Sequence, residues 1–171
     1  IGVEPAIKPA ALQSKNKSVG LLVTQATAKN ERFLSLVNKH RNGANVHIQP
    51  CPELAHLIEQ GHANTQQSEM LLQRYLSPLL KKNIDSLVLG CTHYPFVSEQ
   101  IKQILGDKVR LLETALPVTQ ELIRQLDKHD LSAPSNVSHD VSVRDNPRIS
   151  FYSTKPSANQ QTIINQLWQE Q

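Results

Sequence analysis

Short apolar or alternating runs are separated by amphipathic stretches along most of this chain. Four of the runs have the pattern of β-strands, and each is followed directly by Thr, Pro or Gly. They cover residues 19–23, 45–49, 87–89 and 109–113. Stretches with the helical period cover residues 28–40, 54–58, 65–82, 95–105 and 116–128. Because strands and helices alternate, the sequence predicts an α/β fold, with a parallel sheet of about four strands and helices on both faces.

The longest helical pattern, over residues 65–82, contains a proline. Its apolar residues are spaced for one buried face, and they are Met70, Leu71, Tyr75, Leu76, Leu79 and Leu80. Pro78 lacks the amide hydrogen that a helix interior uses, and its ring clashes with the preceding turn. We therefore expect a kink or a break at Pro78.

The pattern weakens after Lys128. Residues 129–147 are rich in Ser, Asn, Asp and Pro without a period, which is typical of a flexible loop. Residues 148–152 then predict a last strand. Residues 157–169 predict a final amphipathic helix, whose apolar residues are Ile163, Ile164, Leu167 and Trp168.

Length and charge restrict the class of protein. The 171 residues have room for one domain, or for one domain and part of another. The net charge of +3 is spread without a basic block, so nothing indicates binding to nucleic acid or to a membrane surface. No apolar run is long enough to cross a bilayer, and no signal-peptide pattern is present, so we expect a cytoplasmic protein. The chain begins at Ile1 and its only methionine is Met70, which indicates a trimmed chain or a fragment.

Reactive side chains gather where the third apolar run ends. Gly90 follows residues 87–89, and a thiol, a hydroxyl and an imidazole come next, in Cys91, Thr92 and His93. In open α/β sheets, ligands bind at the carboxyl ends of the strands. A helical pattern begins shortly afterwards, and the partial positive charge of a helix N-terminus favours thiolate over thiol. Cys91 is therefore a candidate reactive thiol, and the alternative is a buried structural cysteine in a strand-to-helix turn.

Two hydroxyls follow the first apolar run. Thr24 and Thr27 flank the turn between residues 19–23 and the next helical pattern. A threonine at this place caps a helix or hydrogen-bonds a carboxylate ligand. From the residues alone we favour capping for either threonine, with Thr27 as the candidate cap of the helix that follows.

The run Gly90-Cys91-Thr92-His93-Tyr94-Pro95 closely resembles the second cysteine motif of glutamate racemases. The related aspartate racemases usually carry Glu where this chain has His93. The resemblance implies an enzyme without a cofactor or a metal, in which Cys91 is an acid/base group, His93 assists it and Thr92 binds the substrate carboxylate. A thiol with an ordinary pKa of about 8.5 needs such assistance to ionise at pH 7.

The resemblance extends to other residues. The family has Thr-x-Gly-Thr at the end of this domain's first strand, where both threonines contact substrate; Thr24 and Thr27 match, whereas Ala26 departs from the usual Gly. Glu59 matches a family glutamate at the edge of the active site. Cys51 lies where the family tolerates a cysteine without using it as a base.

Glutamate racemases have two similar α/β domains with the active site between them. The first carries Asp-Ser-Gly and Cys-Asn-Thr motifs, and neither occurs in this chain. Residues 1–114 resemble the second domain, and residues 115–171 resemble the tail that returns to the first. We therefore expect the isolated chain to be inactive. The helices near Leu116 and Trp168 should lack their partner surface, and so expose apolar area or pair with another chain, as in a homo-oligomer.

The implied reaction is the interconversion of L- and D-glutamate by two cysteines, which supplies D-glutamate for peptidoglycan in bacteria. By resemblance, Cys91 would deprotonate L-glutamate. Two alternatives remain: a racemase for another amino acid such as aspartate, and an inactive truncated domain that only binds glutamate or another protein. A metal site at Cys91 and His93 is disfavoured, because a closed zinc site takes four ligands.

Overall fold

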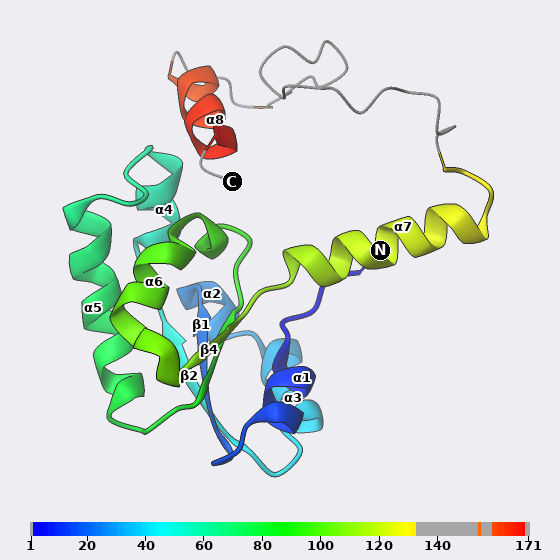
Figure 1. Ribbon diagram of the computed structural model, residues 1–171. Helices are drawn as coiled ribbons and strands as arrows, with labels where there is room; N and C mark the ends of the chain where they lie inside the picture. Colours follow the sequence, from blue (N-terminus) through cyan, green and yellow to red (C-terminus); the bar gives the residue numbers. More distant parts are fainter. Residues whose placement is uncertain (1, 133–153, 155–158, 170–171) are drawn as a thin grey trace.

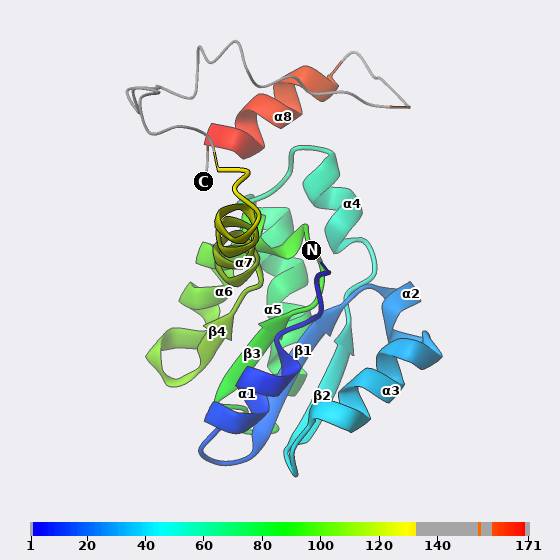
Figure 2. The ribbon, with the colours of Figure 1, turned by 90° about the vertical axis from the view of Figure 1, so that its right-hand side faces the viewer.

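The computed structural model describes residues 2–132, 154 and 159–169. Its four strands are β1 (Ser18–Val23), β2 (Asn45–Pro50), β3 (Ser86–Leu89) and β4 (Arg110–Leu112). All neighbours pair in parallel, in the order β2-β1-β3-β4, which Figure 2 shows nearly face on. The predicted parallel α/β sheet is therefore confirmed. The further strand expected over residues 148–152 lies outside the described residues.

The register places the carboxyl ends of the strands along one edge of the sheet. Val19 of β1 pairs with Val46 on one side and with Ser86 on the other, and Ser86 pairs with Arg110 of β4. Every residue of β1 and β3 is buried. These two strands lie at the centre of the sheet and are covered on both faces, which explains their short, nearly continuous apolar runs.

Helices cover both faces of the sheet (Figure 1). On one face lie α1 (Ile7–Gln13) and α3 (Glu31–His40), which share an apolar cluster with β1. On the other lie three helices that share a second apolar cluster, namely α4 (Leu54–Glu59), α5 (Gln66–Leu80) and α6 (Ser98–Leu105). Two 3₁₀ turns flank α6, η1 (Tyr94–Val97) before it and η2 (Gly106–Lys108) after it. None of the helices within the described residues is both long and apolar enough to cross a membrane.

The helix predicted over residues 28–40 is α3, which begins only at Glu31, and a separate short helix, α2 (Gln25–Ala28), precedes it. The chain breaks at Asn30, whose side-chain oxygen accepts a hydrogen bond from the Phe33 amide at 3.0 Å and caps α3. Thr24 caps α2 by accepting from the Thr27 amide at 3.2 Å. The expected capping role of Thr24 is therefore confirmed, whereas the expectation that Thr27 caps the helix is wrong.

The long helix α5 differs from the prediction in its buried face. Met70 and Leu80 were expected on the buried face, but they are 66% and 39% exposed and do not belong to the core. The buried stripe instead includes Ser68, whose hydroxyl donates to Gln100 of α6 at 2.7 Å. The helix also runs through Pro78 without a break and ends two residues later. A proline in the last turn removes only one hydrogen bond from the helix.

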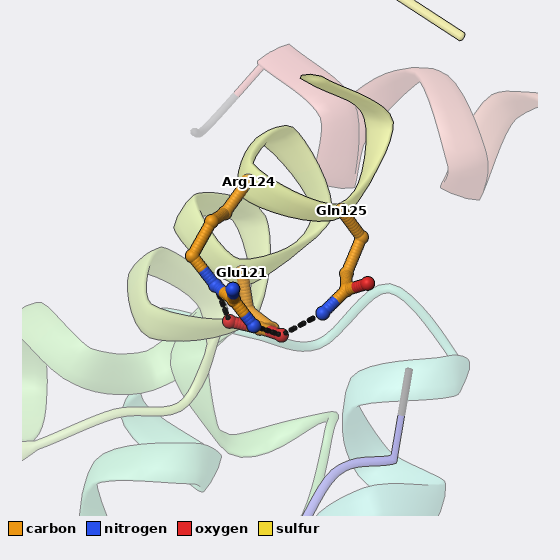
Figure 3. Close-up of polar contacts among 3 residues, drawn as sticks. All are labelled: Glu121, Arg124 and Gln125. Atoms are coloured by element: carbon orange, nitrogen blue, oxygen red, sulfur yellow. Dashed lines mark hydrogen bonds and ion pairs between the residues drawn. The ribbon is translucent and has the colours of Figure 1, made fainter. Parts of the chain in front are cut away.

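Helix α7 (Ala115–Lys128) projects away from the sheet (Figure 1) and has no buried residue. Three of its large apolar side chains are exposed, Leu116, Leu122 and Ile123, as expected for this helix. Arg124 and Gln125 donate hydrogen bonds to the Glu121 carboxylate (Figure 3), and they lower the pKa of Glu121 to about 2. These polar contacts lie within α7 itself, so they leave its apolar residues uncovered.

Helix α8 (Gln160–Gln169) lies above α4 in both ribbon views. Leu167 packs against the apolar cluster that α4, α5 and α6 share, and Ile163 and Ile164 are half-buried. The expectation that the last helix lacks a partner surface is therefore wrong for these residues; the side chain of Trp168 lies outside the described part. Most of the expected loop over 129–147 is also outside it, since the description stops at residue 132.

Candidate active site

Gly90 allows β3 to reach the carboxyl edge of the sheet beside β1. Its amide donates to the Leu22 carbonyl at 2.8 Å. A Cβ atom at this position would lie 2.8 Å from both that carbonyl oxygen and a methyl group of Val23. Any side chain would therefore push β3 away from β1. The close approach fixes the point at which the chain turns into Cys91.

Cys91, His93 and Glu59 form a chain of contacts at this edge. The Cys91 Sγ atom lies 3.7 Å from Nδ1 of His93, and Nε2 of the same ring lies 2.9 Å from Oε1 of Glu59. An ionised carboxylate only accepts hydrogen bonds, so Nε2 carries the hydrogen. Nδ1 of the neutral ring is then free to accept a proton from the thiol. The Glu59 carboxylate thus holds the ring in the orientation that turns Nδ1 toward the thiol.

The thiol opens into a shallow hollow of about 170 Å³. The lining residues come from the first residues of the chain, the end of β3 and the end of β4, and they are Val3, Pro5, Leu89, Gly90, Cys91, Thr92 and Thr114. Cys91 is half-buried and Thr92 is exposed. The structure thus brings Cys91 and Thr92 to one cavity and sets His93 and Glu59 beside it.

Thr24 and Thr27 lie at the end of β1, the strand next to β3. Their hydroxyl oxygens are 2.8 Å apart, and both side chains are half-buried. Neither residue lines the hollow at Cys91. The two threonines therefore stand on the same edge of the sheet as the thiol and form a separate polar pair.

Cys51 has the opposite environment to Cys91. It is 2% exposed, and burial raises the pKa of its thiol to about 12. Its Sγ atom donates to the Gln49 carbonyl at 3.5 Å. Both thiols are free, since no disulfide joins them. A group that stays protonated cannot act as a base, so the geometry favours Cys91 as the reactive cysteine.

Two neighbours of the thiol, Val3 and Pro5, were not predicted from the sequence. Val3 and Pro5 line the hollow, although the first segment carries no recognisable site signal. Tyr94 follows His93 directly and is fully buried in the apolar cluster that also contains Cys51. Burial also raises the pKa of Tyr94, so its hydroxyl stays protonated.

In the part of the chain that the structure describes, no group of three or more His, Cys, Asp or Glu side chains is arranged to hold a metal ion.

Curated sequences match most of this chain, although no protein-family profile does. A glutamate racemase from Pseudomonas aeruginosa is 34% identical over 168 residues, which is 98% of this chain and 60% of that protein. A glutamate racemase from Ectopseudomonas mendocina is 40% identical over 133 residues, which is 78% of this chain and 51% of that protein. The chain thus spans about half to three fifths of the length of these relatives.

Solved structures show the same relationship. Escherichia coli glutamate racemase, in complex with L-glutamate and the activator UDP-MurNAc-ala, superposes with a TM-score of 0.68 at 32% identity, covering 82% of this chain and 52% of that one. Glutamate racemase from Francisella tularensis, in complex with D-glutamate, gives a TM-score of 0.73 at 27% identity, covering 95% and 59%. The shared fold therefore corresponds to a part of these larger proteins.

Proposed function

Because this chain belongs to the glutamate racemase family, we propose that it forms part of an enzyme that interconverts L- and D-glutamate. The observation that carries the proposal is the half-buried Cys91 thiol, which opens into a hollow and has His93 and Glu59 behind it. The product D-glutamate would supply peptidoglycan synthesis in the cytoplasm of a bacterium.

Racemisation removes the Cα proton from one face of the amino acid and returns a proton to the other. As a thiolate, Cys91 takes the Cα proton on its Sγ atom, and the electron pair stays on the substrate carbon. A second acid on the opposite face then donates its proton to that carbon. In the reverse direction Cys91 is the thiol that donates. Two thiols suffice for this exchange, so the proposal needs no cofactor.

Neighbouring groups have supporting roles in this scheme. His93 accepts the thiol proton through Nδ1 when the thiolate forms, and Glu59 holds the opposite nitrogen. Thr92 lines the hollow and binds the substrate carboxylate through its hydroxyl. Thr24 and Thr27 complete the binding of substrate from the end of β1, next to β3.

The second acid/base group must come from outside this chain, because Cys51 is buried and held protonated. We assign residues 1–114 to the second domain of the enzyme and residues 115–171 to the tail that meets the first. The exposed apolar residues of α7 support this assignment, with a second copy of the chain as the alternative partner. The isolated chain, with one acid/base thiol, is expected not to racemise glutamate.

A chimera tests the proposal. This chain would replace the matching part of the Pseudomonas aeruginosa glutamate racemase, and racemisation would be measured by circular dichroism of glutamate. We expect activity with the chimera, loss of at least a thousandfold with Cys91→Ser, and retention with Cys51→Ser as the matched control. A folded chimera that keeps its activity after Cys91→Ser would overturn the assignment.

A further inference from the structure

Helix α8 rests on Gly61, just after the end of α4, although about 100 residues separate them in sequence. The Gln166 side-chain amide donates to the Gly61 carbonyl at 3.5 Å. Leu167 packs against the apolar cluster that includes Leu54 and Ile58 of α4. The contact therefore joins the C-terminal helix to Gly61, just beyond the end of α4, and to the apolar cluster that α4 shares with α5 and α6.

Gly61 makes the close approach possible. Its backbone has a φ of +80°, a left-handed conformation that suits the end of a helix and that glycine adopts without strain. A Cβ atom there would lie 3.4 Å from both Ile163 and Gln166 of α8. Helix α8 thus packs against the backbone of Gly61, which lies two residues after Glu59 in the sequence.

Helix α4 depends on tertiary contacts for its position. It has six residues, it follows Glu53 in the left-handed region, and no side chain caps its N-terminus. A helix this short is not stable without packing. Its buried residues Leu54, Leu57 and Ile58 face the core, whereas Glu59 at its end is exposed and reaches His93. Whatever holds the last turn of α4 therefore also holds the Glu59 carboxylate.

We propose that α8 is a positioning element for Cys91, which packs on Gly61 and so keeps the Glu59 carboxylate against His93. The inference rests on the proposed role of Cys91 and adds a named contact that controls its reactivity. Ile163 and Gln166 are positioning residues that act through Glu59 and do not touch the reacting atoms.

The test is the pH dependence of Cys91 alkylation by iodoacetamide in the full chain, followed by mass spectrometry of the Cys91 peptide. The contact variant combines Ile163→Ala and Gln166→Ala. The matched control combines Gln161→Ala and Asn165→Ala, which removes two exposed α8 side chains that bond only to each other at 3.0 Å in the described structure. A third protein carries Glu59→Gln and gives the effect of losing the carboxylate directly.

We expect Glu59→Gln to raise the midpoint pH of alkylation by on the order of half a unit, because the imidazole that accepts the thiol proton loses the carboxylate that stabilises its charged form. The contact variant should also raise the midpoint pH of alkylation, and the control variant should keep the midpoint of the parent chain. Adding the contact changes to Glu59→Gln should give no further shift, since both act through one carboxylate.

Amide hydrogen exchange gives a second measurement that does not depend on chemistry at the thiol. The contact variant should exchange faster over α4 (Leu54–Glu59) while β1 and β3 stay protected. The proposal is overturned if the contact variant keeps the parent midpoint or if its shift adds to that of Glu59→Gln. If Glu59→Gln itself has no effect, the route through Glu59 is wrong, while the chimera still tests the racemase assignment separately.

Discussion

Nε2 of His93 lies 2.9 Å from Oε1 of Glu59, although 34 residues separate them in sequence. The imidazole thus joins the end of α4 to the turn after β3, and its other nitrogen faces the Cys91 thiol at 3.7 Å. The carboxylate is 62% exposed and the imidazole 33%. A polar contact so open to water contributes little to stability, so its main consequence is the orientation of His93 beside the thiol.

The two cysteines should differ in their reaction with alkylating agents. Cys91 is half-buried at a hollow, whereas Cys51 is 2% exposed and burial raises its pKa to about 12. At pH 8 in the folded chain, we expect iodoacetamide to modify Cys91 at least tenfold faster than Cys51, measured by peptide mass spectrometry.

Unfolding provides the control for this prediction. In concentrated urea both thiols are in water, so the difference between Cys91 and Cys51 should largely disappear. Equal rates in the folded chain would contradict the burial of Cys51 and remove the reason for choosing Cys91 as the acid/base group.

Gly90 should tolerate no larger residue. Gly90→Ala would bring a methyl group to 2.8 Å from the Leu22 carbonyl oxygen and from a Val23 methyl, both within the central strand β1. We expect the free energy of unfolding to fall by about 1–3 kcal/mol, measured by urea denaturation.

Gly2→Ala is the matched control, because a Cβ atom at Gly2 would meet nothing within 4 Å. It should leave the midpoint of unfolding where it is in the parent chain. If Gly90→Ala proved as stable as this control, the close approach of β3 to β1 would not hold in solution.

The sheet was predictable because its central strands are buried on both faces. The short apolar runs that end at Val23 and Leu89 lie between helical patterns, and a short, continuous apolar run in that place is typical of a buried parallel strand. The start of α3 after Asn30 was missed because Asn30 does not disturb the spacing of the apolar residues. It marks the start of the helix only by accepting a hydrogen bond from the Phe33 amide. The buried face of α5 was misjudged because Ser68, a polar residue, is buried and bonded to Gln100.

The candidate site was predictable only in part. Cys91, Thr92 and His93 are consecutive, so a single strand end brings them together. The pairing of His93 with Glu59 depends on how α4 packs, and periodicity carries no information about it; the family resemblance pointed to Glu59 instead. The contact of α8 with Gly61 depends on a chain reversal of about 100 residues, which no local pattern encodes.

Stability should rise with pH near neutrality because of His47. Desolvation, with repulsion from Lys82, lowers the pKa of this imidazole, whose Nε2 atom lies 3.2 Å from the Ser18 hydroxyl. The unfolded chain therefore binds more protons than the folded one just below pH 6.5, and stability is lost as the pH falls through that window. Urea denaturation at pH 5.5 and 7.5 should show a smaller pH effect in His47→Gln than in the parent. An identical pH effect in both proteins would contradict this prediction.

Asp85 should fasten the turn before β1 to the start of β3, at the edge of the sheet opposite Cys91. Its Oδ2 atom accepts hydrogen bonds from the amides of Lys15 at 2.6 Å and Asn16 at 3.0 Å, and Oδ1 accepts from the Ser86 hydroxyl at 3.1 Å. Partial burial raises the pKa of Asp85, but these hydrogen bonds outweigh it and hold the pKa below the ordinary value. We expect Asp85→Ala to lower the free energy of unfolding at pH 7 by about 1–2 kcal/mol.

The pH dependence of stability distinguishes the contribution of the Asp85 charge from that of its packing and hydrogen bonding. A carboxyl group with a lowered folded-state pKa stabilises the protein above its unfolded pKa, near 4, and this contribution is lost as the pH falls through the folded value. Asp85→Asn keeps an acceptor oxygen for the two amides but removes the charge. Its deficit relative to the parent should therefore shrink between pH 5 and pH 3 in urea denaturation. A deficit that stays constant over this range would mean that packing, and not the ionised carboxylate, holds this turn.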